Sequence, residues 1–142
     1  MKKLLIIGFV LCLVSCKSEL EIITAKKISV TPGIASGQKY SKYVISVNKK
    51  SNTTIQIDSI HINKNGKCYQ PNFILVKEKS PTQLTVFSEN GNYVISASLL
   101  NTKPLDSDCN IAKNGAAIYF KEGDKSKAIT IRAFSEEKKS LR

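Results

Sequence analysis

A period of two in the distribution of apolar residues constrains this chain more than any other feature. Over 43–48, 93–99 and 129–133 every second residue is apolar, and most of the residues between them are polar. This period places one face of a β-strand in a core and the other in water, as in antiparallel sheets. From residue 22 onward no stretch shows a clear 3.6-residue helical period. The pattern therefore predicts an all-β fold.

Turn signals such as Asn65-Gly66 and Asn114-Gly115 divide the chain into short strands. The expected strands are 26–31, 40–48, 53–63, 67–70, 73–78, 83–88, 92–100, and 115–121 paired with 126–134. We predict a single antiparallel β-sandwich, immunoglobulin-like, over residues 22–135. The absence of tryptophan argues against a true antibody-type domain. Residues 136–142 carry charges of both signs and one apolar side chain, so we expect a frayed tail.

One irregularity in the segment 53–63 is informative. Ile55 and Ile57 share one phase of the alternation, whereas Ile60 and Ile62 share the opposite phase. A regular strand cannot bury all four on one face. The sequence therefore predicts at Asp58-Ser59 either a β-bulge or the point where the strand crosses between sheets.

Residues 1–15 have the features of a cleaved export signal. Lys2 and Lys3 precede an apolar run that is shorter than the roughly 20 residues a membrane-spanning helix needs. The segment 13–16, Leu-Val-Ser-Cys, resembles the bacterial lipobox. That resemblance implies that Cys16 receives a diacylglycerol thioether, that the preceding peptide is removed, and that the new amino group is often acylated. Residues 16–21 would then be a lipidated tether to the membrane.

Charge and location narrow the class of partner. The formal net charge is +11, but the lysines are scattered rather than interleaved with aromatic residues on one patch. An exported protein rarely meets nucleic acid, so we expect none, and favour an acidic envelope polymer or protein as partner. Lys17-Ser18 lacks the aspartate that favours inner-membrane retention in enterobacteria, which favours the outer membrane, facing the periplasm or the cell surface.

The four cysteines reduce to two in the folded domain. Cys12 leaves with the signal and Cys16 carries the lipid, so Cys68 and Cys109 remain. Two thiols of a small domain in an oxidising compartment most often pair. We therefore predict a Cys68–Cys109 disulfide.

Residues suited to catalysis are few. His61 is the only histidine, and the inward phase of its neighbours points it outward. A metal site would need His61 with Cys68 and Cys109, and the spacing matches no common zinc motif. The loop 106–110 is rich in oxygen ligands but lacks the glycine and distal glutamate of an EF-hand loop. No cofactor is expected.

Two hypotheses for function follow from these residues. The leading hypothesis is a non-enzymatic binding or envelope-structural module, with the long loops at 31–39, 63–72 and 101–114 carrying the binding residues. The alternative is a metal-binding protein or enzyme that uses His61 with Cys68 and Cys109.

Several segments together resemble small β-sandwich lipoproteins of the Bacteroidota, especially of flavobacteria. They are 24–27, the glycine and serine residues at 33, 36 and 37, the tyrosine-rich strand 40–43, the isoleucine-rich strand 54–62, and the hairpin 117–120 with 129–131. The resemblance implies a small sandwich lipoprotein and brings no activity with it. Asp58-Ser59-Ile60 also resembles the three-residue O-glycosylation acceptor of exported Bacteroidota proteins, which makes Ser59 a possible O-glycosylation site.

Overall fold

The computed structural model describes residues 20–34, 37–50, 52–80 and 82–140. Cys16 and the rest of the lipobox lie outside the described residues. The described part of the chain forms ten strands. They are β1 (Leu20–Thr31), β2 (Tyr40–Lys49), β3 (Ile55–Lys64), β4 (Lys67–Tyr69), β5 (Phe73–Lys77), β6 (Gln83–Leu84), β7 (Gly91–Ser98), β8 (Ala116–Glu122), β9 (Lys125–Ile131) and β10 (Ser135–Ser140).

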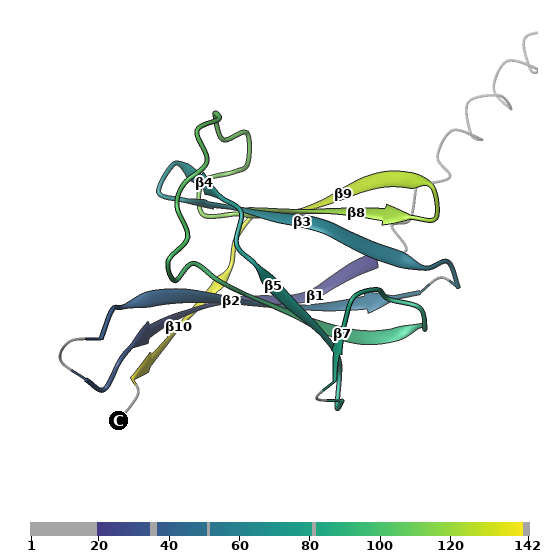
Figure 1. Ribbon diagram of the computed structural model, residues 1–142, viewed down its shortest axis with the longest axis horizontal. Helices are drawn as coiled ribbons and strands as arrows, with labels where there is room; N and C mark the ends of the chain where they lie inside the picture. The colour runs from purple at the N-terminus through teal and green to yellow at the C-terminus, as the bar shows by residue number, and fades with distance from the viewer. Residues whose placement is uncertain (1–19, 35–36, 51, 81, 141–142) are drawn as a thin grey trace, which may run out of the picture.

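Two sheets pack face to face, so the predicted β-sandwich is confirmed (Figure 1). The six-stranded sheet has the order β10-β1-β2-β7-β5-β6, and the four-stranded sheet has the order β4-β3-β8-β9. All neighbouring strands are antiparallel except β1 and β10, which run parallel. The sandwich is therefore antiparallel with one parallel pair at an edge, which corrects the wholly antiparallel expectation.

The core lies between the sheets and is built by the residues that set the two-residue period. Ile45 of β2 and Ile95 of β7 face Ile60 of β3 and Ile118 of β8, and all four are fully buried. Phe87 and Tyr93 add an edge-to-face aromatic pair with ring centroids 4.5 Å apart. Burial of each such side chain contributes roughly 1.5–3 kcal/mol. The alternation in the sequence is thus explained by this shared core.

The irregularity in β3 is a β-bulge, which was one of the two predicted alternatives. The pairing of β3 with β8 shifts register between Ile57 and Ser59, so Asp58 is the additional residue. The bulge turns both halves of the strand inward, and Ile55, Ile57, Ile60 and Ile62 are all buried. The strand stays within one sheet throughout.

The start of the domain differs from the expectation. Residues 20 and 21 were assigned to the tether and the first strand to 26–31, but β1 begins at Leu20, which is 1 % exposed. A second register shift, between Ile22 and Thr24, accounts for the difference. It interrupts the alternation there, so the first half of β1 does not show a period of two.

The charged tail also differs from the expectation. Residues 135–140, expected from position 136 to fray, form β10 alongside β1. The side chains of β10 are all exposed, so backbone pairing rather than burial holds the strand. Phe134 fixes its start by packing edge-to-face on Tyr43, with ring centroids 4.9 Å apart. The register also places Glu136 beside Lys27.

Candidate functional site

Three connections meet at one end of the sandwich. They are the connection after β1, described at 32–34 and 37–39, the turn 65–66 after β3, and the long loop 99–115 after β7 (Figure 1). These connections fall within or overlap the three loops that the sequence singled out for binding. The start of β1 lies at the opposite end (Figure 1). We refer to the end at which the three connections lie as the loop end.

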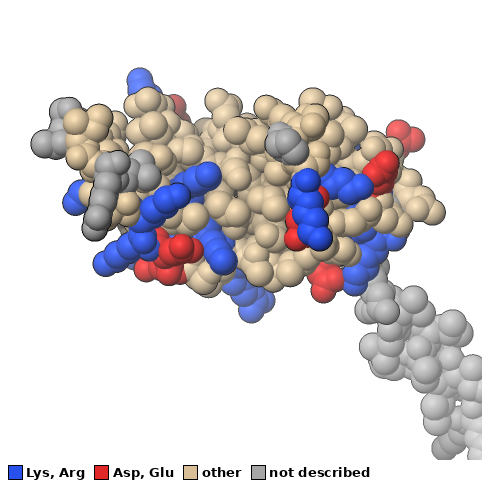
Figure 2. Space-filling model, turned by 90° about the horizontal axis from the view of Figure 1, so that it is seen from below, with Lys and Arg blue, Asp and Glu red and all other residues tan. Residues whose placement is uncertain are grey.

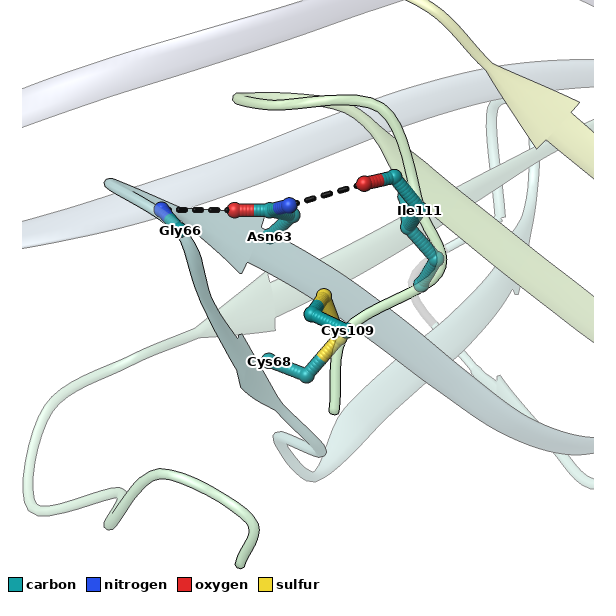
Figure 3. Close-up of a disulfide and its surroundings, with 5 residues drawn as sticks. All are labelled: Asn63, Gly66, Cys68, Cys109 and Ile111. Atoms are coloured by element: carbon teal, nitrogen blue, oxygen red, sulfur yellow. Dashed lines mark hydrogen bonds between the residues drawn. A yellow bond between two sulfur atoms is a disulfide. The ribbon is translucent and has the colours of Figure 1, made fainter. Parts of the chain in front are cut away.

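A disulfide fastens the long loop to the four-stranded sheet. Cys68 in β4 is linked to Cys109, with a Cα–Cα distance of 5.3 Å (Figure 3). The backbone N–H of Leu105 donates to the carbonyl of Cys68 at 2.7 Å, and Pro104 forms a β-bridge with Tyr69. The predicted disulfide is therefore confirmed, and the loop covers the free edge of β4.

Asn63 is a second fastening that sequence reasoning missed. Its side chain is almost fully buried; Nδ2 donates to the carbonyl of Ile111 at 2.8 Å, and Oδ1 accepts from the N–H of Gly66 at 2.9 Å (Figure 3). The turn between β3 and β4 has positive φ at both Asn65 (56°) and Gly66 (90°), as a type I′ hairpin turn requires. The Asn65-Gly66 pair predicted that turn, but an asparagine two residues before the pair is typical of ordinary exposed turn sequence. Only the tertiary contact with the loop distinguishes Asn63.

A polar pocket of about 140 Å³ lies at the loop end. Its polar lining residues include Lys39, Tyr40, Ser41, Lys64, Tyr69 and Thr102. The first three belong to β2 or the residue before it, the next two to β3 and β4, and the last to the long loop. The pocket thus draws on both sheets and on the long loop, and none of the described residues that line it is acidic.

Tyr43 lies next to this region on the inward face of β2. Burial, together with charge repulsion from the neighbouring Tyr69 and Glu136, raises the pKa of its phenol to about 12. The phenol therefore stays neutral at any physiological pH. Tyr43 is a structural neighbour of the pocket rather than a proton donor for chemistry near pH 7.

The outward face of the six-stranded sheet offers a different kind of surface. Ile74, Val76, Val94 and Ser96 share this face by register, and Ile74 is 50 % exposed. Figure 2 shows a band without charge on this face, between groups of lysine and glutamate side chains nearer its two ends. A shallow groove of about 310 Å³ runs along β5 there, with Lys42 at its border. The band suits apolar contact but lacks the convergent polar groups of the loop end.

The histidine and the two sulfur atoms do not form the alternative site in this structure. Both sulfur atoms are consumed in the disulfide, and the ring of His61 packs edge-to-face against Tyr119 at 5.0 Å. Within the residues that the structure describes, no three His, Cys, Asp or Glu side chains are placed to hold a metal ion. Ser59 is half-buried in β3 of the four-stranded sheet, opposite Tyr119 in the register. Its glycosylation stays a prediction.

Comparisons with known proteins add little to this picture. No family model and no curated protein matches the chain. Among solved structures, an inactive mutant of a GH20 exo-β-N-acetylglucosaminidase from Vibrio harveyi is 11 % identical, with a TM-score of 0.36. The match covers 84 % of this chain but 18 % of that one. A likeness this distant supports no conclusion about fold or activity. No helix in the described ranges is long and apolar enough to span a membrane.

Proposed function

We propose that this chain is a lipid-anchored binding module of the bacterial envelope, which contacts an acidic partner through its loop end and acts without catalysis. The observation that carries the proposal is the convergence of three connections at the end opposite the start of β1, where Cys68–Cys109 holds the longest of them in place. Loops fixed on a rigid scaffold are where binding residues usually lie.

We also propose that the sandwich is immunoglobulin-like, and its strand order supports this. Immunoglobulin-type sandwiches have strands ABED in one sheet and CFG in the other. Here β1-β2-β7-β5 are consecutive neighbours in one sheet and β3-β8-β9 in the other. If these seven strands are lettered A to G in chain order, the two sheets have the same strand orders, ABED and CFG. β10 is an addition to that pattern, because it extends the first sheet beyond β1.

The disulfide supports export. Structural disulfides persist in oxidising compartments and are rare in the reducing cytosol. An exported domain agrees with a signal at 1–15 and with lipidation of Cys16, and the lack of an aspartate at Lys17-Ser18 favours the outer membrane. Four residues beyond Cys16 reach at most about 14 Å. A domain that begins at Leu20 would therefore stand with its loop end directed away from the membrane.

Replacement of Cys16 tests the anchor. The Cys16→Ser protein should incorporate no labelled fatty acid and should move from the membrane fraction to the soluble or unprocessed fraction. Two or three acyl chains anchor a protein stably, since each buried CH₂ contributes about 0.8 kcal/mol. Cys12→Ser is the matched control and should keep both label and membrane location. Fatty acid on the Cys16→Ser protein would refute the lipoprotein assignment.

Charge removal at the two ends tests the binding surface. Lys103 and Lys113 lie in the long loop, whereas Lys121 and Lys125 flank the turn at the opposite end. The mature lipoprotein in detergent would be passed over immobilised acidic polymers extracted from its own envelope. We expect Lys103→Gln with Lys113→Gln to reduce retention several-fold, and Lys121→Gln with Lys125→Gln to leave it unchanged. Equal loss in both pairs would show only general charge attraction and would contradict a loop-end site.

A further inference from the structure

The polar pocket at the loop end joins one lysine from each sheet. Lys39 directly precedes β2 in the six-stranded sheet, and Lys64 is the last residue of β3 in the four-stranded sheet. The pocket that they share also receives the long loop through Thr102. Because the disulfide and Asn63 fix that loop, the two lysines border a pocket whose walls are held in place.

The positive charges of Lys39 and Lys64 have no acidic counterpart among the described residues that line the pocket. Lys50, Lys77 and Lys127 each form an ion pair with a glutamate elsewhere on the molecule. Around Lys39 and Lys64, in contrast, none of the lining residues that the structure describes is acidic. An anion placed there would receive charge-assisted hydrogen bonds, which are shorter and roughly twice as strong as neutral ones.

A buried hydroxyl points to the same conclusion. Ser41 lines the pocket and is only 5 % exposed, yet its hydroxyl has no hydrogen-bond partner within the described ranges. Leaving a buried polar group unpaired costs about 1–3 kcal/mol, so nearly all such groups in native proteins have a partner. A bound acceptor in the pocket would supply that partner.

Size and lining identify the class of ligand. About 140 Å³ is smaller than the roughly 300–1,000 Å³ of pockets that enclose a whole small molecule, so the pocket suits one group of a larger ligand. Tyr40 and Tyr69 provide aromatic surface with polar tips, and Leu99 adds an apolar wall. A sugar ring packs on such a surface while an attached anion reaches the ammonium groups.

We infer that this pocket binds the carboxylate or phosphate of an acidic sugar, held between Lys39 and Lys64. The inference rests on the proposed binding function and deepens it, because it names the chemical group that the loop end recognises. Carboxylate and phosphate share the needed chemistry, namely a compact anion that accepts several hydrogen bonds.

Saturation-transfer difference NMR on the mature lipoprotein in deuterated detergent tests the inference. The probes are glucuronate, glucose 6-phosphate and neutral glucose. We expect transfer to one or both anionic sugars, with the stronger response assigning carboxylate or phosphate, and at least a ten-fold weaker response for glucose. Absence of transfer to both anionic sugars, or equal transfer to glucose, would overturn the inference.

Paired variants then locate the site. Lys39→Gln with Lys64→Gln should raise the dissociation constant for the anionic sugar at least ten-fold, and Ser41→Ala should raise it by a smaller factor. Lys121→Gln with Lys125→Gln removes the same charge at the opposite end of the sandwich and should leave sugar binding unchanged. Circular dichroism melting confirms that each variant folds. Undiminished binding in the Lys39 and Lys64 pair would refute the pocket, while retention on envelope polymers would still report separately on the proposed function.

Discussion

Removal of the Cys68–Cys109 disulfide should cost the protein a large part of its stability. The cleanest perturbation is Cys68→Ser with Cys109→Ser, which leaves no unpaired thiol in the domain. The two cysteines are 41 residues apart, and the chain-entropy relation for a closed segment of that length gives about 4 kcal/mol. A small domain has a total free energy of unfolding of about 5–15 kcal/mol.

This loss corresponds to a marked shift in melting temperature. Unfolding entropy is about 2.1 cal/mol/K per residue, so in a domain of about 120 residues a loss of 4 kcal/mol lowers the midpoint by about 15 °C. The effect arises in the unfolded chain, because the hydrogen bonds from Asn63 to the long loop and from Leu105 to Cys68 remain available in the folded variant. We therefore expect unchanged far-ultraviolet circular dichroism at low temperature.

Urea denaturation of the oxidised protein and the double serine variant measures the difference directly. The variant should unfold at lower urea and with a slightly larger m-value, since its unfolded chain is more expanded. Reductant should shift the wild-type midpoint toward that of the variant and should not affect the variant. Midpoints that agree within error, with and without reductant, would refute the view that this disulfide stabilises the fold.

Four further predictions follow from single side chains and from the last strand. Asn63→Ala should lower the free energy of unfolding by about 1–3 kcal/mol in urea, because it leaves the partly buried carbonyl of Ile111 without its donor; a loss below 0.5 kcal/mol would contradict the role given to Asn63. The pKa of Tyr43 is about 12 when folded and near 10 when unfolded, so its contribution is present below pH 10 and lost as pH rises from 10 to 12; urea midpoints should show a fall over that range that is smaller in Tyr43→Phe. His61→Ala should change stability by about 1 kcal/mol or less and leave retention on envelope polymers intact, whereas loss of retention with intact folding would favour the enzyme or metal alternative. Deletion of 135–142 should expose the edge of β1 and produce dimers or larger species in size-exclusion chromatography; a deletion protein that stays monomeric at high concentration would contradict this.

Local patterns predicted those parts of the fold in which side-chain burial decides the conformation. The two-residue period identified β2 and β7, whose inward residues are buried, and the change of phase between Ile57 and Ile60 located the bulge at Asp58. A bulge is visible in sequence only where strongly apolar residues flank it on both sides. In β1 the phase shift falls beside Ala25 and the lysines that follow it, so half of that strand was missed.

The candidate site was predictable only in outline. Turn residues marked the connections, but which of them share an end depends on how the strands pair across 40 residues or more. The pocket between Lys39 and Lys64 exists only because the start of β2 lies beside the end of β3 in the other sheet. No local pattern distinguishes these lysines from the others in a chain of net charge +11.

The charged tail shows that a segment in which no side chain is buried can still form a strand. Residues 136–139, Glu-Glu-Lys-Lys, bury no side chain, which led to the expectation of fraying. The free edge of β1 nevertheless offers unpaired backbone groups, and the tail satisfies them through a parallel ladder from Ser135 to Ser140. Once the tail is a strand, it becomes the new edge of the six-stranded sheet. Exposed charges, lysine above all, are what protects such an edge from pairing with another molecule. The same residues that argued against a strand therefore suit the one position in the sheet where a strand must resist further pairing.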